Sequence, residues 1–402
     1  MKIHFQHTSF FYLQNEFIII LLEIKAVILI KKFRIISICL FILGILLNII
    51  TGSMPNLVEK YYSNGINIYM VKFMSKIFNI LPFSVFEILI YIAVLSVLVF
   101  LIYSIYFVVK NPNKTLAYLK NSILNIISIV GIVYFLFVIL WGINYNRMDL
   151  QYSLIADYNA SNNEKIKNVN YDEDDLINLY KFLVEKCNYT RPKVLEDDNQ
   201  VMKYNTDYKE VLERANNGYE DVSVLNLNKR DGYAPAKSIL NSKLLCYTGI
   251  TGIYSPFTGE ANVNIAAPDI YIPFTTLHEM AHQRGYGSED ECNFLAYIAC
   301  INNEDYDFQY SGYILALKYT ASALAKTDYD SFKEISSKLS QSVKNDLKNS
   351  SNFWRKYEGK INEVSDNMNN KYLKVNGVKE GTESYGKVVN LFLIYYSLYG
   401  FN

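Results

Sequence analysis

The hydrophobic positions of the chain follow two different patterns, which change near residue 147. Three long apolar runs cover residues 35–50, 83–109 and 122–143, and the second and third together contain one charged residue, Glu87, close to the start of the second. About 20 apolar residues are needed to cross the hydrocarbon of a bilayer. Residues 35–147 are therefore predicted to be a transmembrane region with about three helical spans, preceded by an amino-terminal flank over residues 1–34. The alternative, buried helices of a soluble core, is disfavoured because uncharged runs of this length are hard to place there.

Beyond the third run, the pattern is typical of a water-soluble domain. Residues 148–175 are polar and rich in Asn and Asp, which predicts a linker. Apolar residues then recur at helical spacing from Asp174 to Cys187 and again after Ser288, while residues 238–267 carry short apolar runs cut by glycines. The fold class expected from this pattern is an α-helical transmembrane region followed by a helix-dominated α+β domain over residues 176–402.

Basic residues predict the orientation of these spans. Lys31, Lys32 and Arg34 precede the first run, and three lysines lie in the short segment between the second and third. After the third run, Arg147 is the only nearby positive charge. Because cytoplasmic loops are enriched in Lys and Arg, we expect a multi-pass cell-membrane protein with an extracytoplasmic domain after Trp141.

Overall charge and cysteine content exclude several classes of protein. The formal net charge of the 402 residues is zero, so no nucleic-acid or polyanionic partner is expected. The five cysteines are scattered and include no C-x-x-C pair. They therefore predict neither a disulfide framework nor a cysteine-ligated zinc site.

The candidate chemistry lies in the segment His278-Glu-Met-Ala-His282. On a helix, two histidines four residues apart share one face and can bind one zinc ion. Glu279 follows the first histidine, where its carboxylate can act as general base toward a metal-bound water; this H-E-x-x-H pattern is typical of zinc peptidases. The alternative is two ordinary helical histidines. It is disfavoured because no other histidine follows the membrane region.

A third ligand and its neighbours are predicted just downstream. Pro273 and the glycines after His282 are typical of a helix start and end, and a second helix is expected from Ser288, with Ser288 and Glu291 forming a capping box. That leaves Glu289 as the third metal ligand. Asn293, one turn later, is expected to orient a ligand. The alternatives are an acid that stabilises the helix dipole for Glu289 and an exposed polar residue for Asn293.

A strand is predicted upstream of the metal-binding helix. Ala261, Val263 and Ile265 alternate with Asn262 and Asn264, which is the period-two pattern of a strand. Such a strand could be a sheet edge that binds an extended peptide through Asn262, Val263 and Asn264. A purely structural strand is equally compatible with the pattern.

Several of these segments also carry a family resemblance. The pieces are Trp141-Gly-Ile-Asn-Tyr-Asn-Arg147, Pro256-Phe-Thr-Gly-Glu-Ala-Asn-Val-Asn264, His278 to Gly285, Glu289 to Tyr297 and Glu383-Ser-Tyr-Gly386. Together they resemble a bacterial membrane-anchored H-E-x-x-H family defined by a domain of unknown function, number 3810.

More distantly, the chain is similar to gluzincin-type zinc metallopeptidases, and this likeness implies a zincin-like metallopeptidase domain. In gluzincins the third ligand is a Glu followed four residues later by Asp or Asn, which corresponds to Glu289 and Asn293. Cys292 departs from the usual Ala. The resemblance supplies no substrate.

The sequence therefore predicts a membrane-anchored metallopeptidase that uses one Zn²⁺ ion. Its expected partners are a peptide or protein substrate and the lipid bilayer. The alternative is a non-catalytic membrane sensor or scaffold that retains a structural metal site. Glu279 favours the enzyme, because a purely structural site needs no general base, and a structural zinc would usually have a fourth protein ligand.

Overall fold

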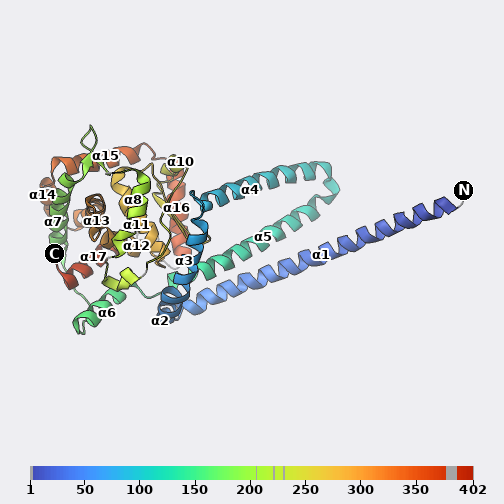
Figure 1. The fold of residues 1–402 in the computed structure, drawn as a ribbon, viewed down its shortest axis with the longest axis horizontal. Coiled ribbons are helices and arrows are strands. Elements are labelled where there is room, and N and C mark those ends of the chain that lie inside the picture. The colour runs from blue at the N-terminus through green and yellow to red at the C-terminus, as the bar shows by residue number, and fades with distance from the viewer. Residues whose placement is uncertain (1–2, 205, 221, 230, 377–386, 402) are drawn as a thin grey trace. The chain divides into compact units, whose positions relative to one another are not determined.

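The computed structural model describes residues 3–204, 206–220, 222–229, 231–376 and 387–401, and the protein is built mainly of helices (Figure 1). The chain divides into two compact units. The first comprises Met1–Ile50 and Val94–Ile139, and the second comprises Thr51–Ala93 and Leu140–Asn402. The segment between the first two long helices therefore belongs to the same unit as everything after the third.

Three long helices carry the apolar runs: α1 (Ile3–Gly52), α4 (Val85–Lys110) and α5 (Thr115–Leu140). Among the described residues, the stretches Val27–Gly52, Val85–Lys110 and Pro112–Leu140 are long and apolar enough to cross a membrane, which confirms the predicted number of candidate spans. The first stretch begins earlier than expected because α1 is one continuous helix. These helices indicate membrane association.

Within the first unit, α1 and α5 approach closely. A Cβ added at Gly131 would lie 3.0 Å from the Ser37 carbonyl oxygen, so the small residue permits the contact. Arg34 of α1 also donates hydrogen bonds to the side-chain oxygens of Asn121 and Asn125, both at 3.1 Å. The contact between α1 and α5 therefore combines a small residue with hydrogen bonds from an arginine.

The second unit begins with a short helical connection between α1 and α4. It consists of α2 (Pro55–Leu57), the π-helix η1 (Val58–Ile66) and α3 (Asn67–Phe78). The remaining helices follow α5 in the order α6 (Leu150–Asn162), α7 (Glu173–Thr190), α8 (Tyr208–Arg214), α9 (Asn217–Glu220), α10 (Ser242–Cys246), α11 (Ile272–Gln283), α12 (Glu289–Ile301), α13 (Tyr306–Thr327), α14 (Tyr329–Ser337), α15 (Gln341–Arg355), α16 (Lys360–Val375) and α17 (Lys387–Tyr399). Short 3₁₀ turns cover Pro112–Lys114, Gly142–Asn146, Arg191–Lys193, Val224–Lys229 and Asp269–Tyr271.

Two small sheets complete this unit. β1 (Leu195–Glu196) and β2 (Met202–Lys203) form an antiparallel pair. The other sheet has the strand order β3 (Lys237–Ser238), β5 (Glu260–Val263), β4 (Gly252–Ser255). β5 runs parallel to β3 and antiparallel to β4, so it is the central strand. The domain is helix-dominated, as expected.

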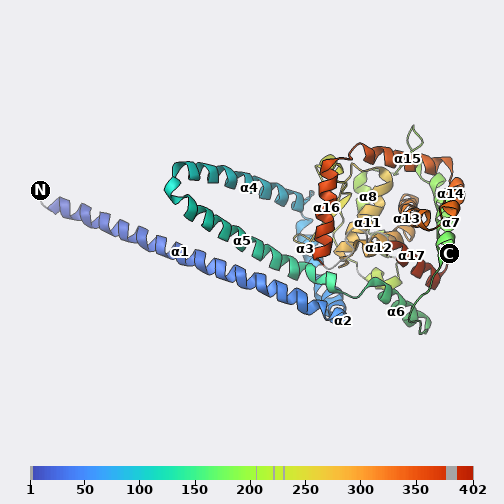
Figure 2. The same cartoon turned by 180° about the vertical axis from the view of Figure 1, so that it is seen from behind.

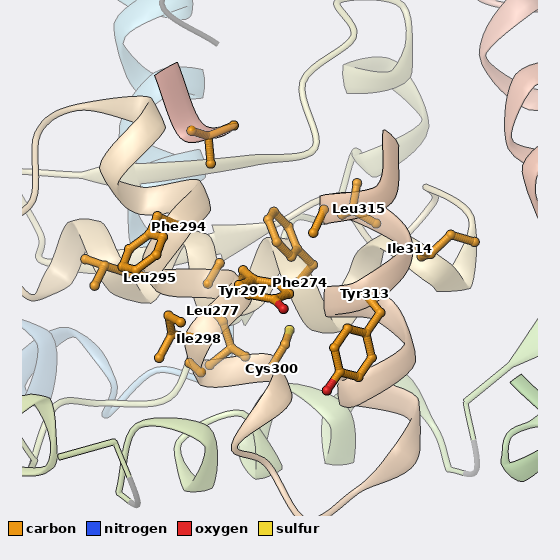
Figure 3. Packing of buried hydrophobic residues seen from close by; sticks show 14 of the residues in the cluster. Phe274, Leu277, Phe294, Leu295, Tyr297, Ile298, Cys300, Tyr313, Ile314 and Leu315 are labelled. Atoms are coloured by element: carbon orange, nitrogen blue, oxygen red, sulfur yellow. The ribbon is translucent and has the colours of Figure 1, made fainter. Parts of the chain in front are cut away.

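The core of the second unit is formed where α11, α12 and α13 pack together at its centre, with α14, α15 and α16 at the periphery (Figures 1 and 2). Figure 3 shows aromatic and aliphatic side chains of all three helices meeting around Tyr297. Every residue of α12 from Asp290 to Cys300 is buried. A Cβ added at Gly312 of α13 would lie 2.5 Å from the Cys300 Cβ, so this glycine permits the close approach of α12 and α13.

The fold confirms one of the predicted segments after the third span and changes the other. The helix expected from Asp174 to Cys187 is confirmed as α7, and its predicted apolar face is buried. The predicted linker over residues 148–175 is wrong across Leu150–Asn162, because this segment forms α6 and buries Leu150 and Leu154 in the main core. Its many Asn and Asp residues obscured an apolar face only a few residues wide.

Candidate metal and catalytic site

The site begins on α11, whose ends follow from its sequence. Pro273 lies in the first turn, where its missing N–H costs no hydrogen bond. The helix ends at Gln283, and Gly285 then adopts a φ of +86° that a glycine accepts without strain. His278 and His282 lie one turn apart between these ends, with their ring centroids separated by 5.0 Å.

The next helix, α12, brings a carboxylate to both histidines. Glu289 is its first residue. Its Oε2 lies 3.1 Å from Nε2 of His278, and its Oε1 lies 3.7 Å from Nε2 of His282. Ligand atoms around one tetrahedral zinc are separated by about 3.3 Å, given metal–ligand bonds of about 2.0–2.1 Å. The three side chains therefore already have the spacing of a shared metal site.

The other ring nitrogen of each histidine, Nδ1, is hydrogen-bonded to an oxygen. Nδ1 of His278 lies 2.9 Å from Oδ1 of Asn293, and Nδ1 of His282 lies 2.7 Å from the carbonyl oxygen of Tyr286. These oxygens accept hydrogen bonds from Nδ1–H, so Nε2 is the nitrogen that each ring directs toward Glu289, and Nε2 of His278 donates to Oε2 of that carboxylate. Nε2 is therefore the atom of each ring that would bind a metal once it carries no proton.

Burial and pairing set the charges of the three candidate ligands. Burial lowers the pKa of His282 to about 4, against the opposing charge of Glu289. Burial alone would raise the pKa of Glu289, but its hydrogen bond with His278 and the charges of both histidines lower it to about 2. Burial alone would lower the pKa of His278, but the hydrogen bond and charge of Glu289 raise it. At neutral pH the carboxylate is ionised and His282 is neutral, as metal ligation requires, whereas Glu289 favours the protonated form of His278, which would have to release its Nε2 proton to bind a metal.

Glu279 lies beside these residues, and its carboxylate packs closely against Gly252. It is buried, and burial raises its pKa to about 8 although the charge of His278 and a backbone hydrogen bond from Tyr254 oppose the shift. A Cβ at Gly252 of β4 would lie only 2.4 Å from its Oε1. Gly252 therefore makes the space that the carboxylate occupies.

The site opens into a cavity of about 840 Å³ whose lining includes residues that sequence reasoning gave no role. The Trp141 ring lies 4.7 Å from that of Tyr254 and 6.0 Å from that of His282. The hydroxyls of Tyr145 and Tyr372 are 2.9 Å apart, and burial raises the pKa of both, with a smaller contribution from the charge of Glu289. Trp141 is the first and Tyr145 the last residue of the Trp-Gly-Ile-Asn-Tyr segment after α5. The sequence around Tyr372, in contrast, contains no motif that would point to the site.

The predicted strand forms, but the prediction that it lies at the edge of the sheet is wrong. Residues 260–263 do form a strand, but β5 has a partner on each side and offers no free edge. Asn262 and Asn264 instead donate side-chain hydrogen bonds to the carbonyl oxygens of Ile253 and Ile250, at 3.1 Å and 2.9 Å. They hold the β4 segment in place, and β4 is the strand that lines the cavity.

The predicted capping box is also wrong. Ser288 does precede α12, but its side chain makes no capping hydrogen bond. Oε1 of Glu291 accepts a hydrogen bond from the Leu150 backbone N–H at 2.8 Å, and burial raises the pKa of this carboxyl to about 8, against the charge of Arg147. Glu291 therefore joins α12 to the start of α6, a contact between residues far apart in the chain.

Comparison with known proteins gives a family. No curated protein and no solved structure matches the chain. The family model described as a protein of unknown function (DUF3810) matches residues 62–393, which include α3, α4, α5 and the whole site. The Glu383–Gly386 piece of the sequence resemblance lies within this match but outside the described residues. The chain belongs to the DUF3810 family of proteins of unknown function.

Proposed function

We propose that this protein is a membrane-anchored, zinc-dependent metallopeptidase with a gluzincin-like site. One observation carries the proposal: both histidine rings use Nδ1 to bind an oxygen acceptor, while both Nε2 atoms converge on the carboxylate of Glu289. One hydrogen-bonded histidine would be enough to satisfy the buried charge of Glu289, so the second histidine is not needed for that purpose. Two histidines oriented in this way, one turn apart, are arranged as ligands of one cation.

His278, His282 and Glu289 would hold the zinc and leave a fourth position facing the cavity. A zinc ion bound there would supply Lewis-acid chemistry, because it lowers the pKa of a bound water and polarises a carbonyl. Glu279 would take the proton of the attacking water and deliver it to the leaving amine. The buried position of Glu279 favours this role, because the pKa of about 8 would fall beside a cation and allow the carboxylate to act as a base.

Two walls of the cavity fit a peptide. The backbone of β4 borders the cavity and could pair with an extended chain. On another side, α16 contributes Ile361, Val364 and Met368, which share one helical face and remain 58–67% exposed. A peptide with apolar side chains would cover this face, so we propose apolar residues beside the cleaved bond.

The alternative function is a metal-dependent sensor or scaffold, and the same variants distinguish the two. The test uses the full chain in detergent, with zinc content measured by mass spectrometry beside cleavage of a peptide library. His278→Ala, His282→Ala and Glu289→Ala should each lose zinc. Glu279→Gln should keep zinc, because Gln fills the same space, and should lose hydrolysis.

The outcomes that count against the proposal are specific. A parent protein that binds no zinc would overturn it. A parent that binds zinc but shows no Glu279-dependent cleavage would favour the sensor. Glu291→Ala serves as the control acidic variant on the same helix, because Glu291 bonds to Leu150 and should leave zinc content unchanged.

We further propose that the site lies on the extracytoplasmic side of the cell membrane. The lysines and arginine before the first span support this orientation. With three spans, the segment after α1 and the segment after α5 emerge on the same side, and both belong to the second unit. A reporter fused after residue 160 should be active only in an exterior-type assay, and one fused after residue 112 should show the opposite. The reverse pattern would place the site inside.

A further inference from the structure

We propose that α3 lies in the surface of the bilayer and holds the candidate active site against it, so that the substrates are juxtamembrane segments of membrane proteins. The membrane contact stands on the structure of α3 and its neighbours. The substrate class rests on the proposed peptidase function.

An apolar stripe runs along the outer face of α3 and the residues that flank it. Its members follow helical spacing and are between 44% and 80% exposed: Ile66, Tyr69, Phe73, Ile77 and Ile80. They carry no charge; Lys76 beside them is exposed, whereas Lys72 lies 3.8 Å from the carboxylate of Asp231. An amphipathic helix of this kind is suited to the boundary between headgroups and acyl chains, where an exposed lysine such as Lys76 can reach the headgroups.

The opposite face of α3 is covered by the domain. Asn67, Val71 and Ser75 are buried at spacings of four residues. Ser75 Oγ accepts a hydrogen bond from the Ala234 N–H at 3.3 Å, and a Cβ at Gly259 would lie 3.1 Å from the Ser75 nitrogen. The helix is therefore fixed to the domain on one side and presents its apolar stripe on the other.

Chain connectivity identifies the bilayer as the occupant of the stripe. The segment Ser53–Ser84 joins the end of α1 to the start of α4, and both helices are candidate membrane spans. Both ends of the segment therefore emerge at the same membrane surface. The exposed apolar stripe between these two ends therefore lies near the lipid, which is closer to it than any soluble partner.

Polar contacts also lock the first turn of α4 into the domain. Both carboxylate oxygens of Glu260 accept hydrogen bonds from the start of α4, from the N–H of Val85 at 3.1 Å and of Phe86 at 2.9 Å. In return, Glu87 accepts hydrogen bonds from the N–H of Leu240 at 2.7 Å and of Asn241 at 3.0 Å. Because the uncharged part of the span begins immediately after Glu87, these contacts place the domain at the membrane boundary.

The same boundary adjoins the cavity. Leu240 and Leu244 at α10 are 65% and 67% exposed beside the start of α4, and the chain then continues into the cavity lining at Thr248. Trp141, which lines the cavity beside His282, is the first residue after α5. Consecutive residues span at most about 3.6 Å each. The wall of the site therefore starts within a few ångströms of the end of a candidate span.

The first test measures membrane contact without any catalysis. A nitroxide label is attached at Phe73→Cys or Leu244→Cys in the full-length Cys39→Ser, Glu279→Gln chain, reconstituted in phosphatidylcholine–phosphatidylglycerol vesicles. Collisions with oxygen should exceed collisions with a water-soluble nickel chelate at both positions. At the control, Tyr329→Cys on α14, which is 62% exposed, the chelate should dominate. Equal behaviour at all three positions would overturn the proposal. So would low access to both reagents at Phe73, which would indicate a protein partner.

The second test concerns the substrate. A single-span reporter carries a cleavable segment either about 5 or about 25 residues from its membrane helix, and the parent should cleave the near segment about 10-fold faster, because effective concentration falls roughly as the −3/2 power of tether length. Equal rates would overturn the juxtamembrane substrate class. No cleavage at either spacing would instead count against the peptidase function, and the label measurements would still decide the membrane contact.

Discussion

Gly252→Ala is the most direct test of how Glu279 is positioned. The added Cβ would lie 2.4 Å from Oε1, 2.6 Å from Cγ and 2.8 Å from Cδ of Glu279. Ordinary contact begins at 3.4 Å, so the carboxylate must move by about 1 Å. A backbone neighbour cannot yield instead, because Gly252 is held in β4 by pairing with Val263.

The size of the effect follows from that displacement. A misplacement of about 1 Å in a catalytic group costs about 10²-fold in rate, or about 2.7 kcal/mol of transition-state stabilisation. Neither histidine nor Glu289 is among the atoms nearest the added Cβ. We therefore expect kcat/KM to fall by about 10²-fold while zinc content and Tm stay close to those of the parent.

The assay is peptide cleavage beside zinc analysis and thermal unfolding of the same samples. Gly65→Ala is the matched control, because its Cβ would meet only the Lys60 carbonyl oxygen at an ordinary 3.6 Å. Parental activity in a folded, zinc-loaded Gly252→Ala protein would refute the placement of Glu279 as the base. Loss of zinc would show instead that the ligands depend on the same space.

Three further predictions address the surroundings of the site. Asn293→Ala should weaken zinc binding about 10- to 100-fold, measured by competition with a chelator, because His278 loses the acceptor that orients its ring. Glu291→Ala should lower the free energy of unfolding by about 1–3 kcal/mol by leaving the Leu150 N–H unpaired, whereas Glu291→Gln should retain most of it; equal losses in urea unfolding would refute this. Because the folded pKa of Glu279 is raised to about 8, its contribution to stability is present at low pH and is lost as the pH rises. Without metal, the difference in unfolding free energy between the parent and Glu279→Gln should therefore fall by about 1.4 kcal/mol per pH unit between about pH 5.5 and 7.5, and a flat difference would contradict the burial argument.

The parts of the molecule that sequence predicted well are governed by local spacing. The apolar runs gave three candidate spans because length and lack of charge are properties of a single segment. His278 and His282 lie on one face of α11 because helical geometry fixes residues four apart. The start of α12 at Glu289 was located correctly from Ser288 and the glycines before it, although the capping box expected there does not form. Each of these inferences needs only neighbours within about one or two helical turns.

The predictions that failed depend on contacts between distant segments. The sequence around Glu291 fits a capping box, and nothing local reveals that Leu150 supplies the donor. The alternation around Asn262 identifies a strand but cannot say whether that strand is central or at an edge, since this depends on β3 and β4. Tyr372 reaches the site from α16 through the tertiary fold alone.

The arrangement of the site also shows which contacts fix its geometry. Leu277 and Met280 of α11 and Phe294 and Tyr297 of α12 are buried in one apolar core, and this packing fixes the two helices that carry the candidate ligands. Hydrogen bonds at Nδ1 then fix each histidine ring on that frame. Here the apolar core fixes the backbone of the candidate ligands and hydrogen bonds orient their rings. That separation of roles is suited to catalysis, which needs a fixed frame and an open coordination position.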